Sequence, residues 1–151
     1  MNALIEDYLR SRGVRYFRGH HDDEFFYLVD FLVEGHRGRL NVHLEVCGDG
    51  RDAVRLSVSP ERFYPADRRD RLTAIAARWN AGDPCVYAVV HESSDPELVG
   101  VSAGTTHRPG DLAGLTDFVD RAVGASIEVF AQLRHAGLPD VADGRALRDA
   151  G

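Results

Sequence analysis

Histidine and acidic residues are concentrated in one short run of the sequence, His20-His21-Asp22-Asp23-Glu24. Imidazole nitrogens and carboxylate oxygens are common metal ligands, so five such side chains in a row are a candidate metal site. A metal ion needs ligands that converge on one point, however, and adjacent residues of an extended chain point in opposite directions. The sequence also lacks a His-x-x-x-His pair. We therefore interpret the run as a solvated acidic turn, and we expect no metal and no cofactor.

A second group of reactive side chains is His43, Glu45 and Cys47, which share one side of a predicted strand. A Cys–His pair can support nucleophilic catalysis. At ~3.3 Å per residue, however, His43 and Cys47 are about 13 Å apart along the strand, too far for direct proton transfer. No nucleophile elbow, phosphate-binding glycine loop or dinucleotide fingerprint is present. We expect a protein that is not an enzyme; a hydrolase remains an alternative only if a cleft brings a base to the thiol.

Length and composition indicate a single globular domain. The chain has 151 residues, is 44% hydrophobic and carries a formal net charge of −6, an acidic balance that argues against nucleic acid as a partner. No apolar run approaches the ~20 residues that span a bilayer, and the amino terminus does not resemble a secretion signal. Two cysteines are too few for a disulfide framework, so we expect both to be reduced and packed in a cytoplasmic protein. We predict one domain over residues 1–138 and a frayed tail over residues 139–151.

Three segments in the first half of the chain have the character of β-strands. Residues 25–33 are rich in aromatic and β-branched residues and are apolar on both faces, which is typical of a strand covered on both sides. Residues 38–47 alternate between apolar and polar side chains, and residues 54–58 continue the apolar face after a glycine-rich turn. These last two segments predict a β-hairpin with one buried face. The opposite face of this hairpin carries Asn41, His43, Glu45, Arg55 and Ser57.

The only tryptophan lies in a predicted helix over residues 72–80, with its apolar residues at i, i+3, i+4 and i+7. We expect Asp67 to cap this helix, and Asn80 and Gly82 to end it in the left-handed conformation. On this interpretation Trp79 is part of the core. Truncation of a fully buried side chain of this size costs ~3–5 kcal/mol, so Trp79→Ala would unfold the protein.

Two further helices are predicted over residues 2–12 and 112–136, with caps at Asn2 and Asp111, and two further strands over residues 86–91 and 98–105. Residues 59–65 are expected to be a connection. Short turns between consecutive strands imply an antiparallel sheet with the helices on one face. We therefore predict an α+β fold, an antiparallel sheet of about five strands in the order α-β-β-β-α-β-β-α.

Four short motifs in the second half of the chain relate it to a known family. They are the end of the tryptophan helix, a proline-containing turn and two segments of the final helix: Ile75-Ala-Ala-Arg-Trp-Asn80, Pro84-Cys-Val-Tyr87, Leu115-Thr-Asp-Phe118 and Phe130-Ala-Gln-Leu133. In these motifs the chain resembles the YbjN family of bacterial proteins, also described as sensory transduction regulators. The match is best from about residue 54 to 134. These are packing motifs, so the resemblance concerns the fold and identifies no active site.

The resemblance implies a fold similar to that of type III secretion chaperones, in which helices pack on a twisted antiparallel sheet. Such chaperones are typically dimers that hold extended segments of client proteins without ATP or catalysis. Proteins of the YbjN family are linked to regulation and stress responses. A fold does not by itself establish a function, because function resides in sites.

Three helices can cover only one face of a five-stranded sheet, so the apolar second face of residues 25–33 and 86–90 requires a partner. We therefore expect a non-catalytic, cytoplasmic protein-binding module whose partner is a protein client or a homodimer mate, and neither nucleic acid nor membrane. The alternative is a sensory regulator that binds a small ligand on the same face. The residues expected to contact the partner are Tyr27, Asn41, His43, Glu45, Arg55 and Tyr87.

Overall fold

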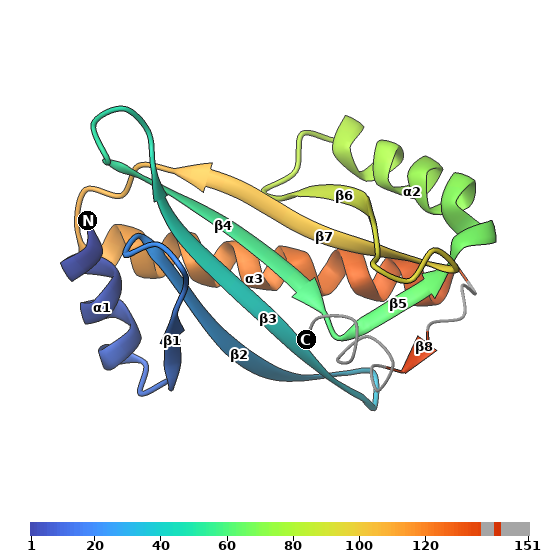
Figure 1. The fold of residues 1–151 in the computed structure, drawn as a ribbon, viewed down its shortest axis with the longest axis horizontal. Coiled ribbons are helices and arrows are strands. Elements are labelled where there is room, and N and C mark those ends of the chain that lie inside the picture. Colours follow the sequence, from blue (N-terminus) through green and yellow to red (C-terminus); the bar gives the residue numbers. More distant parts are fainter. Residues whose placement is uncertain (137–140, 143–151) are drawn as a thin grey trace.

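The computed structural model describes residues 1–136 and the backbone of residues 141–142. A twisted antiparallel sheet lies in front of the long helix α3 (Figure 1). The elements, in chain order, are α1 (Asn2–Ser11), β1 (Tyr16–Arg18), β2 (Glu24–Val33), β3 (His36–Cys47), β4 (Ala53–Pro60), β5 (Arg62–Pro65), the 3-10 turn η1 (Ala66–Arg68), α2 (Arg69–Ala81), β6 (Tyr87–Glu92), β7 (Leu98–His107), α3 (Leu112–His135) and β8 (Val141–Ala142).

The strands follow the order β1-β2-β3-β4-β7 across the sheet, and each neighbouring pair is antiparallel. β6 pairs with the other side of β7, because Ala103 lies between Val58 of β4 and Ala88 of β6. β5 pairs with the beginning of β7, and β8 pairs with β5. The predicted α+β fold and order of elements are confirmed, with β1, β5 and β8 as additional short strands. Of the tail predicted over residues 139–151, only the backbone of β8 is described.

The core lies between one face of the sheet and the helices. The alternation predicted for the β3–β4 hairpin is confirmed, and its inward side chains are fully buried at Leu40, Val42, Leu44, Val54, Leu56 and Val58. From the other side, α1 and α3 bury Ile5, Leu9, Leu115, Val119, Ala122 and Leu133. Burial of a large aliphatic side chain contributes about 1.5–3 kcal/mol, so this layer fixes the strand register. None of the helices in the described ranges is both long and apolar enough to span a bilayer.

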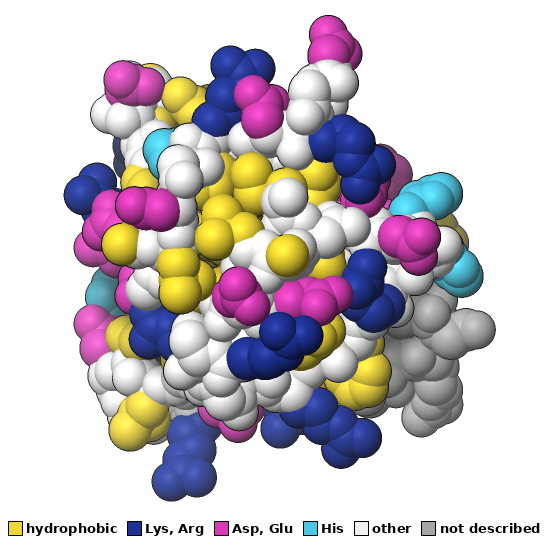
Figure 2. Space-filling model, turned by 90° about the vertical axis from the view of Figure 1, so that its left-hand side faces the viewer, with side chains coloured by type: hydrophobic (Ala, Val, Ile, Leu, Met, Phe, Trp, Pro, Cys, Tyr) yellow, Lys and Arg dark blue, Asp and Glu magenta, His cyan; other side chains and the backbone are white. Residues whose placement is uncertain are grey.

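The end of the molecule that carries α1 has hydrophobic side chains in the middle of its surface and charged side chains around them (Figure 2). On α1, Glu6 binds Arg18 of β1 at 2.6 Å and Arg10 at 3.0 Å. Arg12, just beyond α1, forms an ion pair with Asp120 of α3. Exposed pairs of this kind each contribute only about 0.2–1 kcal/mol. The burial of Ile5 and Leu9 therefore contributes more to holding α1 than its ion pairs do.

Both boundaries of α2 differ from the sequence expectation. Asp67 lies inside η1 and caps nothing, because Ala66 N donates to Glu97 O at 2.7 Å and the chain makes a 3-10 turn before α2 begins. At the other end, Gly82 has a φ of −81°, and the left-handed residue is Asp83, with a φ of 51°. The expected left-handed ending at Asn80 and Gly82 is therefore wrong.

Of the other predicted element boundaries, one is confirmed and two are wrong. Asp111 caps α3 as predicted, since its Oδ1 accepts a hydrogen bond from Gly114 N at 2.7 Å. Asn2 does not cap α1; it lies inside the helix, and its amide donates to Asp22 O and Asp23 Oδ1. The segment expected to be a connection over residues 59–65 instead contains the end of β4 and the whole of β5, because β7 is long enough to pair with both strands.

Asn80 covers the outer edge of β6. Its Nδ2 donates to Ala88 O at 3.0 Å, and its Oδ1 accepts from Ala88 N at 2.8 Å. These two bonds replace the neighbouring strand that a residue at a sheet edge lacks. Beside them, Trp79 Nε1 donates to Val86 O at 2.8 Å. Asn80 and Trp79 thus attach the last turn of α2 to β6.

Replacing Asn80 with alanine removes the hydrogen-bond partners of both the Ala88 N–H and the Ala88 C=O group. Leaving a backbone donor and acceptor unsatisfied costs about 1–3 kcal/mol, whereas the higher helix propensity of alanine returns less than about 0.7 kcal/mol. We expect Asn80→Ala to lower the free energy of unfolding by about 1–3 kcal/mol in urea denaturation. Thr73→Ala, at an exposed position of α2, is the control and should be neutral or slightly stabilising. Equal stability of the two variants would contradict the role of Asn80 at the edge.

Candidate functional site

The face of the sheet opposite α1 and α3 carries no helix in the described part of the chain (Figure 1). The strand register aligns side chains on this face into rows. One row runs from Phe26 through His43, Ser57 and Gly104 to Tyr87. Five of the six residues predicted to contact a partner lie on this face: Asn41, His43, Glu45, Arg55 and Tyr87.

Tyr27, the sixth predicted contact residue, lies on the opposite face. It is only 3% exposed, pairs with Val42 and faces Tyr8 of α1. Burial raises the pKa of Tyr27 far above its ordinary value, and the neighbouring Tyr8 adds to this effect. The prediction was wrong because residues 25–29 are uniformly apolar, so no polar residue indicates which side chains point inward. Tyr27 is therefore removed from the candidate contact surface.

The helix-free face carries both apolar and polar side chains. Its exposed large hydrophobic residues include Phe17 on β1, at 54%, Leu28 and Leu32 on β2, at 46% and 64%, and Tyr87 and Val89 on β6, at 44% and 53%. The strands between them present polar or small side chains, so two apolar borders flank a polar centre. No described residue covers the helix-free face of residues 28–32, so the expected covering of this face by a partner stays a prediction.

The second half of β2 has an unpaired backbone edge in the structure described. β1 pairs only with residues 25–27 of β2. Val46 N donates to Asp23 O at 2.9 Å, and the register then directs the backbone groups of odd-numbered residues of β2 toward β3. The even-numbered residues face away from β3. Asp30 and Leu32 therefore present their backbone N–H and C=O groups at a free edge.

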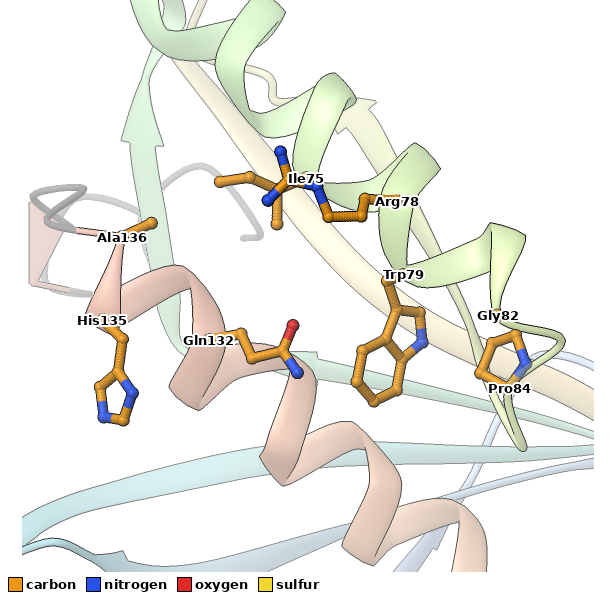
Figure 3. Close-up of a pocket in the computed structure, with 8 residues that line it drawn as sticks. All are labelled: Ile75, Arg78, Trp79, Gly82, Pro84, Gln132, His135 and Ala136. Atoms are coloured by element: carbon orange, nitrogen blue, oxygen red, sulfur yellow. The ribbon is translucent and has the colours of Figure 1, made fainter.

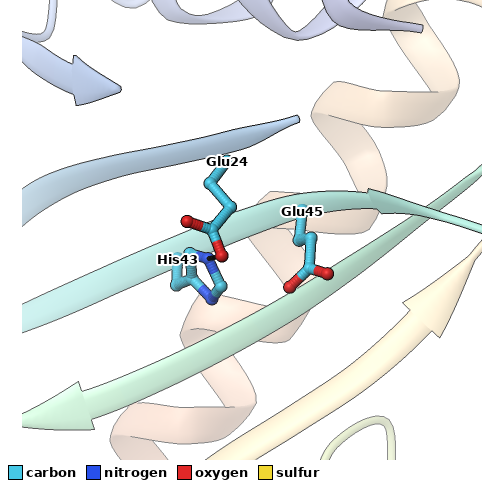
Figure 4. Close-up of side chains that lie close together, drawn as sticks. All are labelled: Glu24, His43 and Glu45. Atoms are coloured by element: carbon cyan, nitrogen blue, oxygen red, sulfur yellow. Dashed lines mark ion pairs between the residues drawn. The ribbon is translucent and has the colours of Figure 1, made fainter. Parts of the chain in front are cut away.

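A group of three ionisable side chains lies near the start of β2 on the helix-free face (Figure 4). Glu24 is directly opposite Glu45 on β3, and His43 is two residues from Glu45 on the same strand. Sequence reasoning placed Glu24 in the acidic run with His20 and His21, which are exposed outside the sheet. The signal that was missed is the pairing of residues 24 and 45, which depends on the position of the turn between β2 and β3.

Another candidate region is a groove between the ends of α2 and α3, with a volume of about 560 Å³ (Figure 3). Its lining residues are Ile75, Arg78, Trp79, Gly82, Pro84, Gln132, His135 and Ala136. Trp79 is half-buried along this groove and not enclosed in the core, because Leu72 and Ala76 occupy the buried side of α2. The cost expected for Trp79→Ala, which assumed full burial, is therefore too high.

The two cysteines do not form the packed pair that was expected. Both are free thiols; Cys47 is half-buried at the end of β3, and Cys85 is exposed in the turn before β6. Pro84 and the short turn place Cys85 outside the sheet, whereas Val86 enters the core. His43 and Cys47 remain four residues apart on one strand.

Comparisons with known proteins support the fold. No protein-family model and no curated protein matches the sequence. Among solved structures, the chain is similar to the crystal structure of YbjN from E. coli, a candidate transcription regulator, with a TM-score of 0.66 and 13% sequence identity. The similarity covers 90% of this chain and 93% of that one. The YbjN-like fold implied by the resemblance is confirmed, but an identity this low identifies no functional residue.

The position of Trp79 can be tested through its fluorescence, because it is the only tryptophan. A half-buried indole at a groove is accessible to a small neutral quencher, whereas a core indole is shielded. We expect acrylamide to quench native Trp79 with a Stern–Volmer constant between those of a buried tryptophan and of the urea-unfolded chain. Native fluorescence resistant to acrylamide would show that the side chain is enclosed after all.

Proposed function

We propose that this chain is a non-catalytic regulatory module that binds another protein, and that it takes an extended segment of that protein along the free edge of β2. The observation that carries the proposal is the unpaired edge from residue 28 to residue 33, with the sequence Leu28-Val-Asp-Phe-Leu-Val33. A regulatory role is compatible with the description of the E. coli protein of similar fold.

The composition of this edge favours pairing with an added strand. Exposed apolar edges attract further strands, and proteins that avoid such pairing use proline, lysine, bulges or very short edge strands. In residues 28–33 the only charged side chain is Asp30, which binds Arg39 at 3.0 Å. Addition of a partner strand to such an edge supplies backbone hydrogen bonds for affinity and alternate side chains for specificity.

The contrast between the two sides of the sheet supports the same proposal. On β6 the backbone of Ala88 is satisfied by the Asn80 side chain. No comparable side chain bonds to the backbone of Asp30 or Leu32 within residues 1–136. A strand added there would place its alternate side chains beside Leu28 and Leu32 on the helix-free face. The expected partner segment is therefore extended, with apolar residues at alternate positions.

A proline at position 30 separates edge binding from folding. It removes the N–H that faces the free edge and leaves the β2–β3 bonds intact, because Asp30 contributes none of them. Asp30→Asn is the matched control, since it removes the ion pair with Arg39 and keeps the N–H. Self-association is measured by light scattering at tens of micromolar, and peptide binding by selection from a displayed library of random peptides.

We expect Asp30→Pro to lose the association and Asp30→Asn to keep it. If the partner is a second copy, the wild type is a dimer and only Asp30→Pro is a monomer. If the partner is another protein, the wild type selects peptides with alternating apolar residues, and these fail to bind Asp30→Pro. Undiminished binding by Asp30→Pro, or a monomeric wild type that selects no such peptide, would refute the proposal.

The second candidate function, a sensor of a small ligand, is favoured by the groove beside Trp79 and not by the sheet face where the sequence suggested it. A volume of about 560 Å³ is within the usual range for small-molecule sites, and Trp79, Pro84 and Arg78 offer apolar surface with one positive charge. A ligand that binds only the folded state raises the melting temperature.

A thermal-shift screen of anionic aromatic metabolites tests this candidate. We expect a true ligand to raise the melting temperature of the wild type by several degrees and to have a much smaller effect on Arg78→Ala. Asp30→Pro should respond like the wild type, because residue 30 does not line the groove. If no compound gives a shift that depends on Arg78, the groove is not a ligand site of this class.

A further inference from the structure

Glu24, His43 and Glu45 bring three possible metal ligands together on the helix-free face. One ligand atom from each residue lies within 4.8 Å of the other two. Figure 4 shows the three side chains pointing toward a common point from two neighbouring strands. All three are partly shielded from solvent, with side-chain exposures of 19% for Glu24, 24% for His43 and 31% for Glu45. The cluster is thus more enclosed than a surface ion pair.

The imidazole in this cluster lacks a hydrogen-bond partner. His43 Nε2 is buried, and no described residue forms a hydrogen bond with it. The nearest carboxylate oxygen, Glu24 Oε1, is 3.8 Å away, which is too long for a hydrogen bond. A buried polar atom without a protein partner is unusual in a native protein, and such an atom is satisfied by a bound water molecule or an ion.

The two carboxylates of the cluster also have few basic side chains near them. Glu24 and Glu45 are directly opposite on adjacent strands, an arrangement in which like charges repel. Glu45 has Arg55 at 3.9 Å, but no arginine of the described residues lies within ion-pair distance of Glu24. The arginine nearest in the sequence, Arg18, binds Glu6 at 2.6 Å. One cation between the two carboxylates would offset their repulsion.

Packing holds the ligands in place. The ring of Phe26 stacks on His43, with centroids 4.5 Å apart and an interplanar angle of 15°. On the other side, Gly19 leaves room for Glu24; a Cβ atom at residue 19 would lie 2.7 Å from Glu24 Cβ and 2.9 Å from Phe26 Cε2. The first distance would require Glu24 to shift, and the second would require Phe26 to shift. The absence of a side chain at residue 19 therefore allows the carboxylate to lie beside the imidazole.

We propose that Glu24, His43 and Glu45 bind a divalent first-row transition-metal ion, such as Zn²⁺. This site is separate from the edge proposed to bind protein. One imidazole with two carboxylates suits Zn²⁺, Co²⁺, Mn²⁺ or Fe²⁺ better than Ca²⁺ or Mg²⁺, which prefer oxygen ligands only. With metal–ligand bonds of about 2.0–2.2 Å, ligand atoms lie about 3–3.5 Å apart, so the 4.8 Å limit requires only small side-chain rotations. Three protein ligands leave a coordination position for water.

The test is titration of the full metal-free chain with Zn²⁺ by calorimetry and with Co²⁺ by visible absorption. The ligand variants are His43→Gln, Glu24→Gln and Glu45→Gln. The controls are His20→Gln and His21→Gln, two exposed histidines of the same region that do not belong to the cluster. Circular dichroism of each variant establishes that it is folded.

We expect one Zn²⁺ ion per chain and a Co²⁺ spectrum with visible bands. Each ligand variant should bind at least about tenfold more weakly, and the two controls should bind as the wild type does. Gly19→Ala changes no ligand but should also weaken binding, because it displaces Glu24. Unchanged affinity in His43→Gln, loss of binding in the His20 or His21 variant, or no binding by the wild type would overturn the proposal. If one ligand variant does not fold, the other two and Gly19→Ala decide the outcome.

Discussion

Alternate side chains of β3 and β4 are buried beneath α3, and a slip of one residue between these strands would expose all of them. The position of every other element depends on this register. β2 pairs with β3 and β7 pairs with β4, so the same alternation continues across the sheet. All three helices then lie on the apolar side. The opposite side keeps its polar centre, with His43 and Ser57 facing each other across the hairpin.

The two edges of the sheet show how local side chains determine what an edge can bind. At β6, Asn80 satisfies the backbone of Ala88, and the helix that carries it covers the strand. At β2, the short strand β1 ends the pairing at residue 27, so the backbone groups of Asp30 and Leu32 have no partner strand in the described chain. The two edges thus differ at these residues, because Ala88 of β6 has a side-chain partner and Asp30 and Leu32 of β2 have none among the described residues. This difference favours β2 for the addition of a strand.

Local patterns predicted the elements well, because alternation along residues 38–47 and helical spacing in residues 112–136 are set by the core itself. They failed where long-range pairing decides the outcome. Nothing near Tyr27 distinguishes inward from outward residues in a uniformly apolar strand. The proximity of Glu24 to Glu45 depends on the register of β2 against β3, which the acidic run does not indicate. Trp79 has helical spacing but lies half-buried, because the end of α2 reaches the edge of the sheet and not its centre.

The open edge of β2 is the central claim, and residue-by-residue amide hydrogen exchange of the monomeric chain tests it most directly. Val29 and Phe31 donate to β3, so their amides should exchange slowly. Asp30 and Leu32 face the free edge, so their amides should exchange faster by orders of magnitude. This alternation between neighbouring residues is the predicted result. Equal protection of all four amides in a monomer would contradict the open edge, because a segment of the same chain would then already be paired with it.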